Sequence, residues 1–107
     1  MAVPFKKRVL IIEDDSAIRA SFALIVNSSQ KFFVVNSYSN CEEAIKHLNN
    51  DRPDIVLMDI ELPGGMNGIQ GTKIIKDKNP HADIVMVTVY EDSELVFEAL
   101  KSGASGY

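Results

Sequence analysis

A short apolar run that ends in a carboxylate constrains the fold of this chain more than any other feature. The run is Ile55-Val56-Leu57-Met58, with Pro53 before it and Leu62-Pro63-Gly64-Gly65 shortly after it. A continuous apolar run of this length between turn-forming residues is typical of a strand buried on both faces. Asp59 would then stand where the strand ends, which is where ligands bind in open parallel α/β sheets. Taken alone, Asp59 could equally begin a solvated turn.

Similar apolar runs alternate with helical patterns along the chain. Strands are expected at residues 9–12, 32–35, 54–59 and 83–87, and residues 104–107 read as the start of a fifth. Helices are expected at residues 16–27, 40–50, 67–78 and 92–103. This alternation implies right-handed βαβ crossovers and a parallel sheet. The sequence therefore predicts an α/β fold with helices on both faces of the sheet.

Local signals define several of these helices. Each expected helix is preceded by residues that can cap its N-terminus. These residues are, in chain order, Asp15 or Ser16, Ser39 or Asn40, Asn67 or Gly68, and Asp92 or Ser93. The inward residues of the first helix are predicted to be Ile18, Phe22, Ile25 and Val26, and those of the second to be Ala44, Ile45 and Leu48. Gly103 is placed to close the last helix.

Length and composition narrow the class of protein. The 107 residues suit one domain. A net charge of −4 gives no support for direct nucleic acid binding. Cys41 is the only cysteine, so no internal disulfide can form and a reducing compartment is expected. The first apolar run is too short to cross a membrane. We expect a cytoplasmic domain without a membrane partner. Cys41 is expected to be a small buried residue, and His47 and His81 are expected at the surface.

Carboxylates follow two of the expected strands. Glu13 and Asp14 follow the first and Asp59 ends the third, and these strands can be neighbours in a parallel sheet. Three such groups repel by about 4 kcal/mol per pair at 4 Å and an effective dielectric constant near 20. Oxygen ligands without Cys or His favour Mg²⁺ as the compensating cation. Thr88 would add a hydroxyl to the same crevice.

The motifs together resemble the receiver domain of two-component response regulators, most closely the LuxR/NarL type. They are Ile11-Ile12-Glu13-Asp14-Asp15, Leu57-Met58-Asp59-Ile60-Glu61-Leu62-Pro63, Met66-Asn67-Gly68, Val87-Thr88-Val89-Tyr90 and Gly103-Ala104-Ser105-Gly106-Tyr107. The resemblance implies a flavodoxin-like, doubly wound parallel sheet of five strands in the order 2-1-3-4-5. It also implies a cytoplasmic phosphoacceptor domain, rather than an enzyme, that switches a DNA-binding transcription regulator.

The resemblance assigns roles to individual residues. Asp59 would accept a phosphoryl group from a histidine kinase. Mg²⁺ would be bound by Asp14 and Asp59, by Glu13 mainly through water, and by the backbone carbonyl of Glu61. Thr88 and Tyr107 would be the switch residues. Asp15 would act as a helix cap.

The sequence departs from the family pattern in three places. The family's phosphate-contacting lysine would follow Tyr107 by three positions, so residues 1–107 read as a receiver domain truncated before the end of its fifth strand and last helix. The truncation would weaken or abolish phosphorylation. It would also bare part of one sheet face, which invites aggregation, strand exchange or formation of a homodimer. DNA would be contacted only through an absent output domain. Gly64-Gly65 adds one residue to a loop beside the site, and Val89 stands where a small residue is common.

Two other functions are compatible with these residues. One is a receiver-like interaction module that is never phosphorylated. The other is a phosphatase with an aspartate nucleophile, but such enzymes carry Asp-x-Asp after the first strand, whereas this chain carries Glu13-Asp14-Asp15-Ser16. Steady turnover of a phosphate ester would favour the phosphatase.

Overall fold

A parallel sheet forms the centre of the molecule. The computed structural model describes residues 6–87 and 103–106. Its strands are β1 (Lys7–Ile12), β2 (Phe32–Tyr38), β3 (Ile55–Asp59) and β4 (Asp83–Val87), in the order β2-β1-β3-β4. All neighbouring pairs are parallel. A parallel bridge between Val85 and Gly106 puts the predicted start of the fifth strand beside β4, so the predicted α/β fold and strand order are confirmed.

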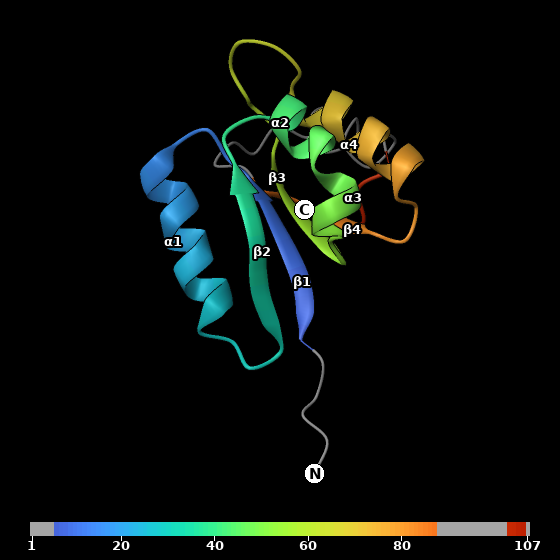
Figure 1. Cartoon of the computed structure of the whole chain (residues 1–107). Coiled ribbons are helices and arrows are strands. Elements are labelled where there is room, and N and C mark those ends of the chain that lie inside the picture. Colours follow the sequence, from blue (N-terminus) through green and yellow to red (C-terminus); the bar gives the residue numbers. More distant parts are fainter. Residues whose placement is uncertain (1–5, 88–102, 107) are drawn as a thin grey trace.

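Helices cover both faces of this sheet (Figure 1). The described helices are α1 (Ser16–Asn27), α2 (Cys41–Lys46), α3 (Leu48–Asp51) and α4 (Gly68–Lys78). In Figure 1, α1 lies on one side of the sheet, and α2, α3 and α4 lie on the other. The predicted helix over 92–103 falls outside the described residues, apart from Gly103. Within the described part of the chain, every helix is too short or too polar to span a bilayer.

The main core lies between the sheet and the α2–α4 side. Alternate residues of β1, β3 and β4 point into it and are almost fully buried: Leu10, Ile12, Val56, Met58, Ile84 and Met86. Ala44, Leu48 and Ile75 close the core from the helices. Each large apolar side chain buried here contributes about 1.5–3 kcal/mol of transfer free energy. This core holds the carboxyl ends of β1 and β3 in fixed positions.

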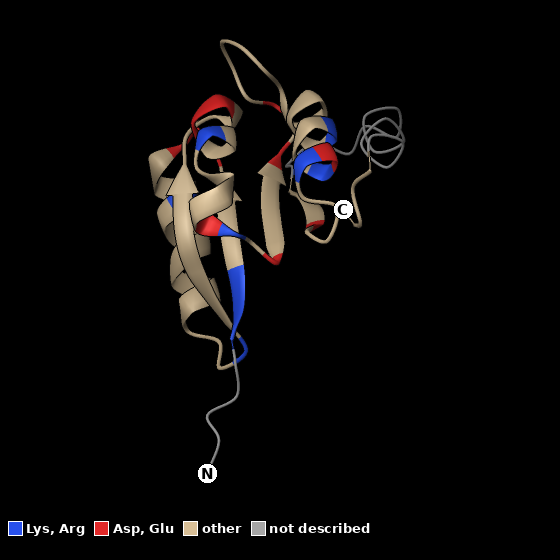
Figure 2. Ribbon diagram, turned by 45° about the vertical axis from the view of Figure 1, so that its right-hand side comes forward, with Lys and Arg blue, Asp and Glu red and all other residues tan. Residues whose placement is uncertain are grey.

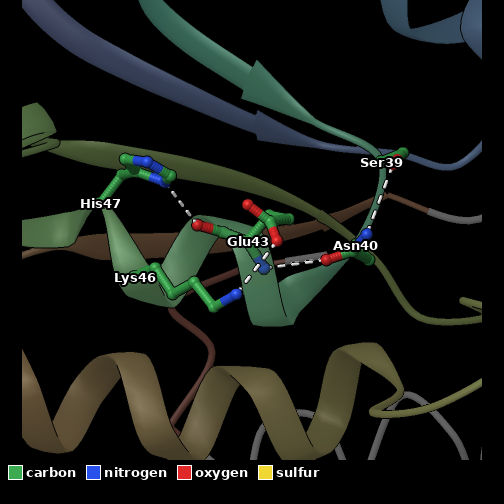
Figure 3. A network of polar contacts seen from close by, with 5 residues as sticks. All are labelled: Ser39, Asn40, Glu43, Lys46 and His47. Carbon is green, nitrogen blue, oxygen red and sulfur yellow. Dashed lines mark hydrogen bonds and ion pairs between the residues drawn. The ribbon is translucent and has the colours of Figure 1, made fainter.

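Side-chain caps begin three of the helices, as the sequence predicted. Asp15 accepts hydrogen bonds from the first-turn amides of α1. Asn40 accepts one from the amide of Glu43 at 2.8 Å (Figure 3). Asn67 and Gln70 form a reciprocal capping box at the start of α4. These bonds satisfy amides that have no partner within the helix.

The predicted inward face of α1 is wrong in part. Ile25 is 66% exposed and Ile18 is 38% exposed, so neither is in the core. The half-buried positions follow an i, i+3, i+4, i+7 pattern instead: Arg19, Phe22, Ala23 and Val26. Apolar residues surround most of this helix, so its periodicity fits more than one face.

The second predicted helix is interrupted at His47. The backbone amide of His47 donates to the carbonyl of Ala44 at 3.2 Å, which tightens the turn. Its imidazole Nδ1 lies 2.9 Å from the carbonyl oxygen of Glu43 (Figure 3). The ring also stacks on Tyr38 with a centroid distance of 5.4 Å. His47 is therefore half-buried rather than a surface residue, and two short helices replace the expected one.

Strand β2 is longer than predicted and contains a bulge. It continues through the polar residues Asn36 and Ser37 to Tyr38. The pairing shifts from Val9 with Val34 to Leu10 with Asn36, so Val35 is the extra residue. The extra residue shifts the alternation of side chains between the two faces of the sheet. Each side chain after Val35 therefore lies on the opposite face from the one that an unbroken alternation would give it. Strand β1 also starts earlier than predicted, at Lys7.

We predict that Gly71→Ala destabilises the domain, although Ala normally stabilises a helix interior by about 1 kcal/mol relative to Gly. A Cβ at position 71 would overlap the buried Sγ of Cys41. Overpacking of this kind costs about 1–3 kcal/mol. Urea unfolding followed by circular dichroism measures the loss.

Cys41→Ala is the matched control for this substitution. It removes the Sγ that the new Cβ would strike, so the double variant should recover part of the lost stability. A double variant less stable than the sum of the two single losses would contradict this packing explanation.

Candidate functional site

Three carboxylates meet at the carboxyl ends of β1 and β3. Glu13, Asp14 and Asp59 each offer an oxygen atom, and these atoms lie within 4.8 Å of one another. Glu13 is buried, Asp59 is half-buried and Asp14 is exposed. In Figure 2 acidic residues, in red, lie at the end of the sheet to which the strand arrows point. The predicted convergence of these side chains is therefore present.

Strand register explains why they meet. Ile12 of β1 pairs with Met58 of β3, so the next residue of each strand stands at the same level. The main chain of Glu13 is held on both sides. Its amide donates to the carbonyl of Tyr38 at 3.0 Å, and its carbonyl accepts from Nη1 of Arg19 at 2.7 Å. Asp15 plays no part in the cluster, because its side chain caps α1.

The side chain of Glu13 is in an unfavourable environment. Its Oε2 atom is buried and has no hydrogen-bond partner among residues 6–87 and 103–106. Burial, together with the nearby carboxylates of Asp59 and Asp14, raises the pKa of Glu13 from 4.5 to about 8. Like charges at 4.8 Å repel by about 3–4 kcal/mol at an effective dielectric constant near 20. A proton on Glu13 or a bound cation would reduce this repulsion.

The residues fit a Mg²⁺ ion. All donors in the cluster are carboxylate oxygens, the ligand type that hard divalent cations prefer. A cation bound among these oxygens would offset the negative charge of Glu13, whose carboxylate belongs to the cluster. Cys41 is fully buried in the core, where burial raises the pKa of its thiol to about 12, so it is not a ligand. This agrees with the prediction that Cys41 is a small buried residue.

The backbone around Asp59 is closely packed. The amide of Glu61 donates to Asp59 Oδ1 at 3.2 Å, and the amide of Gly68 donates to the carbonyl of Ile60 at 2.9 Å. A Cβ at Gly68 would overlap the carbonyl oxygen of Asp59. The sequence pattern identifies Gly68 only as part of a motif and as a possible helix start. The one local signal of its importance is its position directly after the residue that caps α4.

The glycine loop lies beside the N-terminus of α2. Gly64 and Gly65 have φ angles of 67° and 138°, a region that favours glycine. A Cβ at Gly65 would lie 2.6 Å from Oε2 of Glu42. Glu42 thus borders the loop that carries the additional glycine, a contact that sequence reasoning missed because no local pattern links the two segments.

The remaining predicted site residues cannot be placed. The switch residues Thr88 and Tyr107 lie outside the described residues, as does Val89. The amide of Glu61 contacts Asp59, whereas the role expected of its carbonyl as a metal ligand stays a prediction.

Comparison with known proteins identifies relatives along most of the chain. A family model described as the response regulator receiver domain matches residues 9–107. The transcriptional regulatory protein LnrK of Bacillus subtilis is 37% identical over 100 residues, which are 94% of this chain and 45% of LnrK. The oxygen regulatory protein NreC of Staphylococcus haemolyticus is 31% identical over 94% of this chain and 46% of NreC. The chain thus spans about half the length of these relatives.

Solved structures show the same fold. A LuxR-family two-component response regulator from Aurantimonas superposes with a TM-score of 0.89 and 29% identity, covering 96% of this chain and 73% of that one. The response regulator domain of CheB from Thermotoga maritima has a TM-score of 0.85 and 31% identity, covering 95% and 76%. These similarities confirm the flavodoxin-like fold and the LuxR/NarL-type resemblance read from the motifs.

Without divalent ions, the stability of the chain should fall as pH rises from about 4.5 to about 8. The folded pKa of Glu13 is the higher of these values, so the folded state keeps a proton that the unfolded state has released. We expect a loss of about 1–3 kcal/mol, since one pKa unit is worth about 1.4 kcal/mol and solvent relaxation reduces the total. Urea unfolding in a chelator measures it.

Glu13→Gln is the control for this pH dependence. Its side chain has no charge to lose and can donate to Asp14 or Asp59, so the difference between wild type and variant should grow toward pH 8. Parallel pH profiles for the two proteins would contradict the electrostatic account of the site.

Proposed function

The chain belongs to the response regulator receiver domain family, and we propose that Asp59 is its phosphoacceptor. Mg²⁺ would be held by Asp14 and Asp59 directly, by Glu13 mainly through water, and by the carbonyl of Glu61. The observation that carries the proposal is the meeting of three carboxylates, one of them with a buried and unpartnered oxygen. A bound cation would offset this unfavourable arrangement of charge, and it would permit the phosphorylation of Asp59.

The reaction is a phosphoryl transfer from a phosphohistidine of a histidine kinase. A carboxylate oxygen of Asp59 forms a bond to phosphorus as the bond between phosphorus and the imidazole nitrogen breaks, and the nitrogen keeps the electron pair. Mg²⁺ held by Asp14, Asp59 and Glu13 would lower the repulsion between the carboxylates and the incoming phosphoryl oxygens. The amide of Glu61 holds one oxygen of Asp59, which orients the carboxylate.

A phosphoryl group adds negative charge and three strong acceptor oxygens to Asp59. Thr88 follows β4, which pairs with β3, and its hydroxyl would move toward these oxygens. Tyr107 would then turn inward beside β4, where Gly106 already makes a bridge. We infer that this movement changes the surface that a DNA-binding output domain, or a second copy of the receiver, would contact.

The relatives support a regulatory output. LnrK is named a transcriptional regulatory protein, and NreC is named an oxygen regulatory protein. Both names describe those proteins. For this chain, transcription control through an output domain is part of the proposal.

In a full-length version of the protein, incubation with acetyl phosphate and Mg²⁺ should add one phosphoryl group, on Asp59. Intact-mass spectrometry would show the added phosphoryl group, and borohydride reduction followed by peptide mapping would locate it. Asp59→Asn should remain unmodified. Beryllofluoride with Mg²⁺ should shift the amide resonances near Asp59 in the wild type alone.

Asp54→Asn is a matched control, because Asp54 precedes the same strand at its opposite end and is exposed. It should be phosphorylated as the wild type is. Equal modification of the Asp59→Asn variant would overturn the assignment of the phosphoacceptor. A chain that binds Mg²⁺ but takes no phosphoryl group would instead support the non-phosphorylated interaction module.

A further inference from the structure

The position of Glu13 depends on its main chain. In the described part of the chain its Oε2 atom has no hydrogen-bond partner, so no described hydrogen bond fixes the direction of that oxygen. Two bonds fix the backbone instead, one to the carbonyl of Tyr38 and one from Arg19. Tyr38 is the last residue of β2. A contact that holds Tyr38 in place therefore also helps to hold the main chain of Glu13 in place.

The side chain of Tyr38 is anchored away from the acidic cluster. Its hydroxyl donates to Asp51 Oδ2 at 2.5 Å, and its ring stacks on His47 at an interplanar angle of 11°. The bulge at Val35 makes this possible. After the bulge, Tyr38 pairs with Ile12 and shares its face of the sheet, where α3 lies.

Asp51 is itself a firm anchor. It is only 7% exposed, its amide donates to the carbonyl of His47 at 2.9 Å, and its carbonyl accepts from Nε of Arg8 at 2.9 Å. The only other side-chain donor to its carboxylate in the described part of the chain is Asn36, at the marginal distance of 3.5 Å. Burial and the Asp51 carboxylate both raise the pKa of Tyr38, so the phenol stays protonated and able to donate.

We propose that Tyr38 is a positioning residue for the metal site, acting through Glu13, with Asp51 as its anchor. This rests on the proposed function, because the effect is exerted on Mg²⁺ binding. Loss of the Tyr38 hydroxyl frees the end of β2 just before the turn at Ser39 and Asn40. The carbonyl that holds the Glu13 amide then loses its fixed direction, and the buried carboxylate shifts relative to Asp14 and Asp59.

Tyr38→Phe tests the proposal. Partners that orient metal ligands typically contribute 10–100-fold to metal affinity, and Tyr38 acts one step further away, so we expect Mg²⁺ affinity to fall about tenfold. Isothermal titration calorimetry measures this fall. The amide resonance of Glu13 in the metal-free chain should also move, since its acceptor is the carbonyl of Tyr38.

Two variants of Asp51 separate the hydrogen bond from the charge. Asp51→Asn keeps a carbonyl oxygen that can accept from Tyr38, so its Mg²⁺ affinity should stay within about twofold of the wild type. Asp51→Leu should weaken Mg²⁺ binding as Tyr38→Phe does. Combining Tyr38→Phe with Asp51→Leu should cause no further loss, because both remove the same bond.

Ile75→Val controls for a general loss of stability, because Ile75 is fully buried in α4 and has no bond to β2. It should lower the melting temperature without moving the Glu13 amide resonance or the Mg²⁺ affinity. Unchanged affinity and an unmoved Glu13 resonance in Tyr38→Phe would overturn the inference. A wild type that binds no Mg²⁺ would overturn the proposed function, and the Glu13 resonance would still decide whether Tyr38 positions Glu13.

Discussion

Repulsion among the carboxylates of Glu13, Asp14 and Asp59 is the constraint on which the site depends. The sheet forces these groups together, because β1 and β3 are neighbours in register and both end at the same level. The core on the α2–α4 side resists any relaxation, since Ile12 and Met58, the residues just before Glu13 and Asp59, are fully buried. Favourable burial along the strands thus holds an unfavourable cluster of charge at their ends. The cation that we propose to bind there would offset this repulsion.

Much of this could be predicted from the sequence because its signals are local. Continuous apolar runs such as Ile55 to Met58 mark strands of a buried parallel sheet, and Asp15, Asn40 and Asn67 act as caps within one turn of their own helix. The strand order then brings together carboxylates that are about 45 residues apart in the chain. The meeting of Glu13 with Asp59 follows from topology, without any knowledge of side-chain packing.

The errors arose where tertiary contacts outweigh local pattern. Apolar residues surround α1, so periodicity alone could not show that Ile25 faces away from the sheet. The helix break at His47 depends on its ring, which contacts the Glu43 carbonyl and stacks on Tyr38 from a different strand. The steric need for glycine at position 68 depends on the carbonyl of Asp59, nine residues earlier. None of these partners is visible in the local sequence.

The features that the sequence did not predict are in contact with one another. The second half of β2 was not predicted, because Asn36 and Ser37 are polar. That half places Tyr38 at the level of Glu13. The interruption at His47 turns the chain so that α3 presents Asp51 to the Tyr38 hydroxyl. A straight helix through residue 50 and a β2 strand without a bulge would lack this arrangement. The irregularities of the fold therefore support the site, because they surround Tyr38, whose carbonyl accepts from the amide of Glu13.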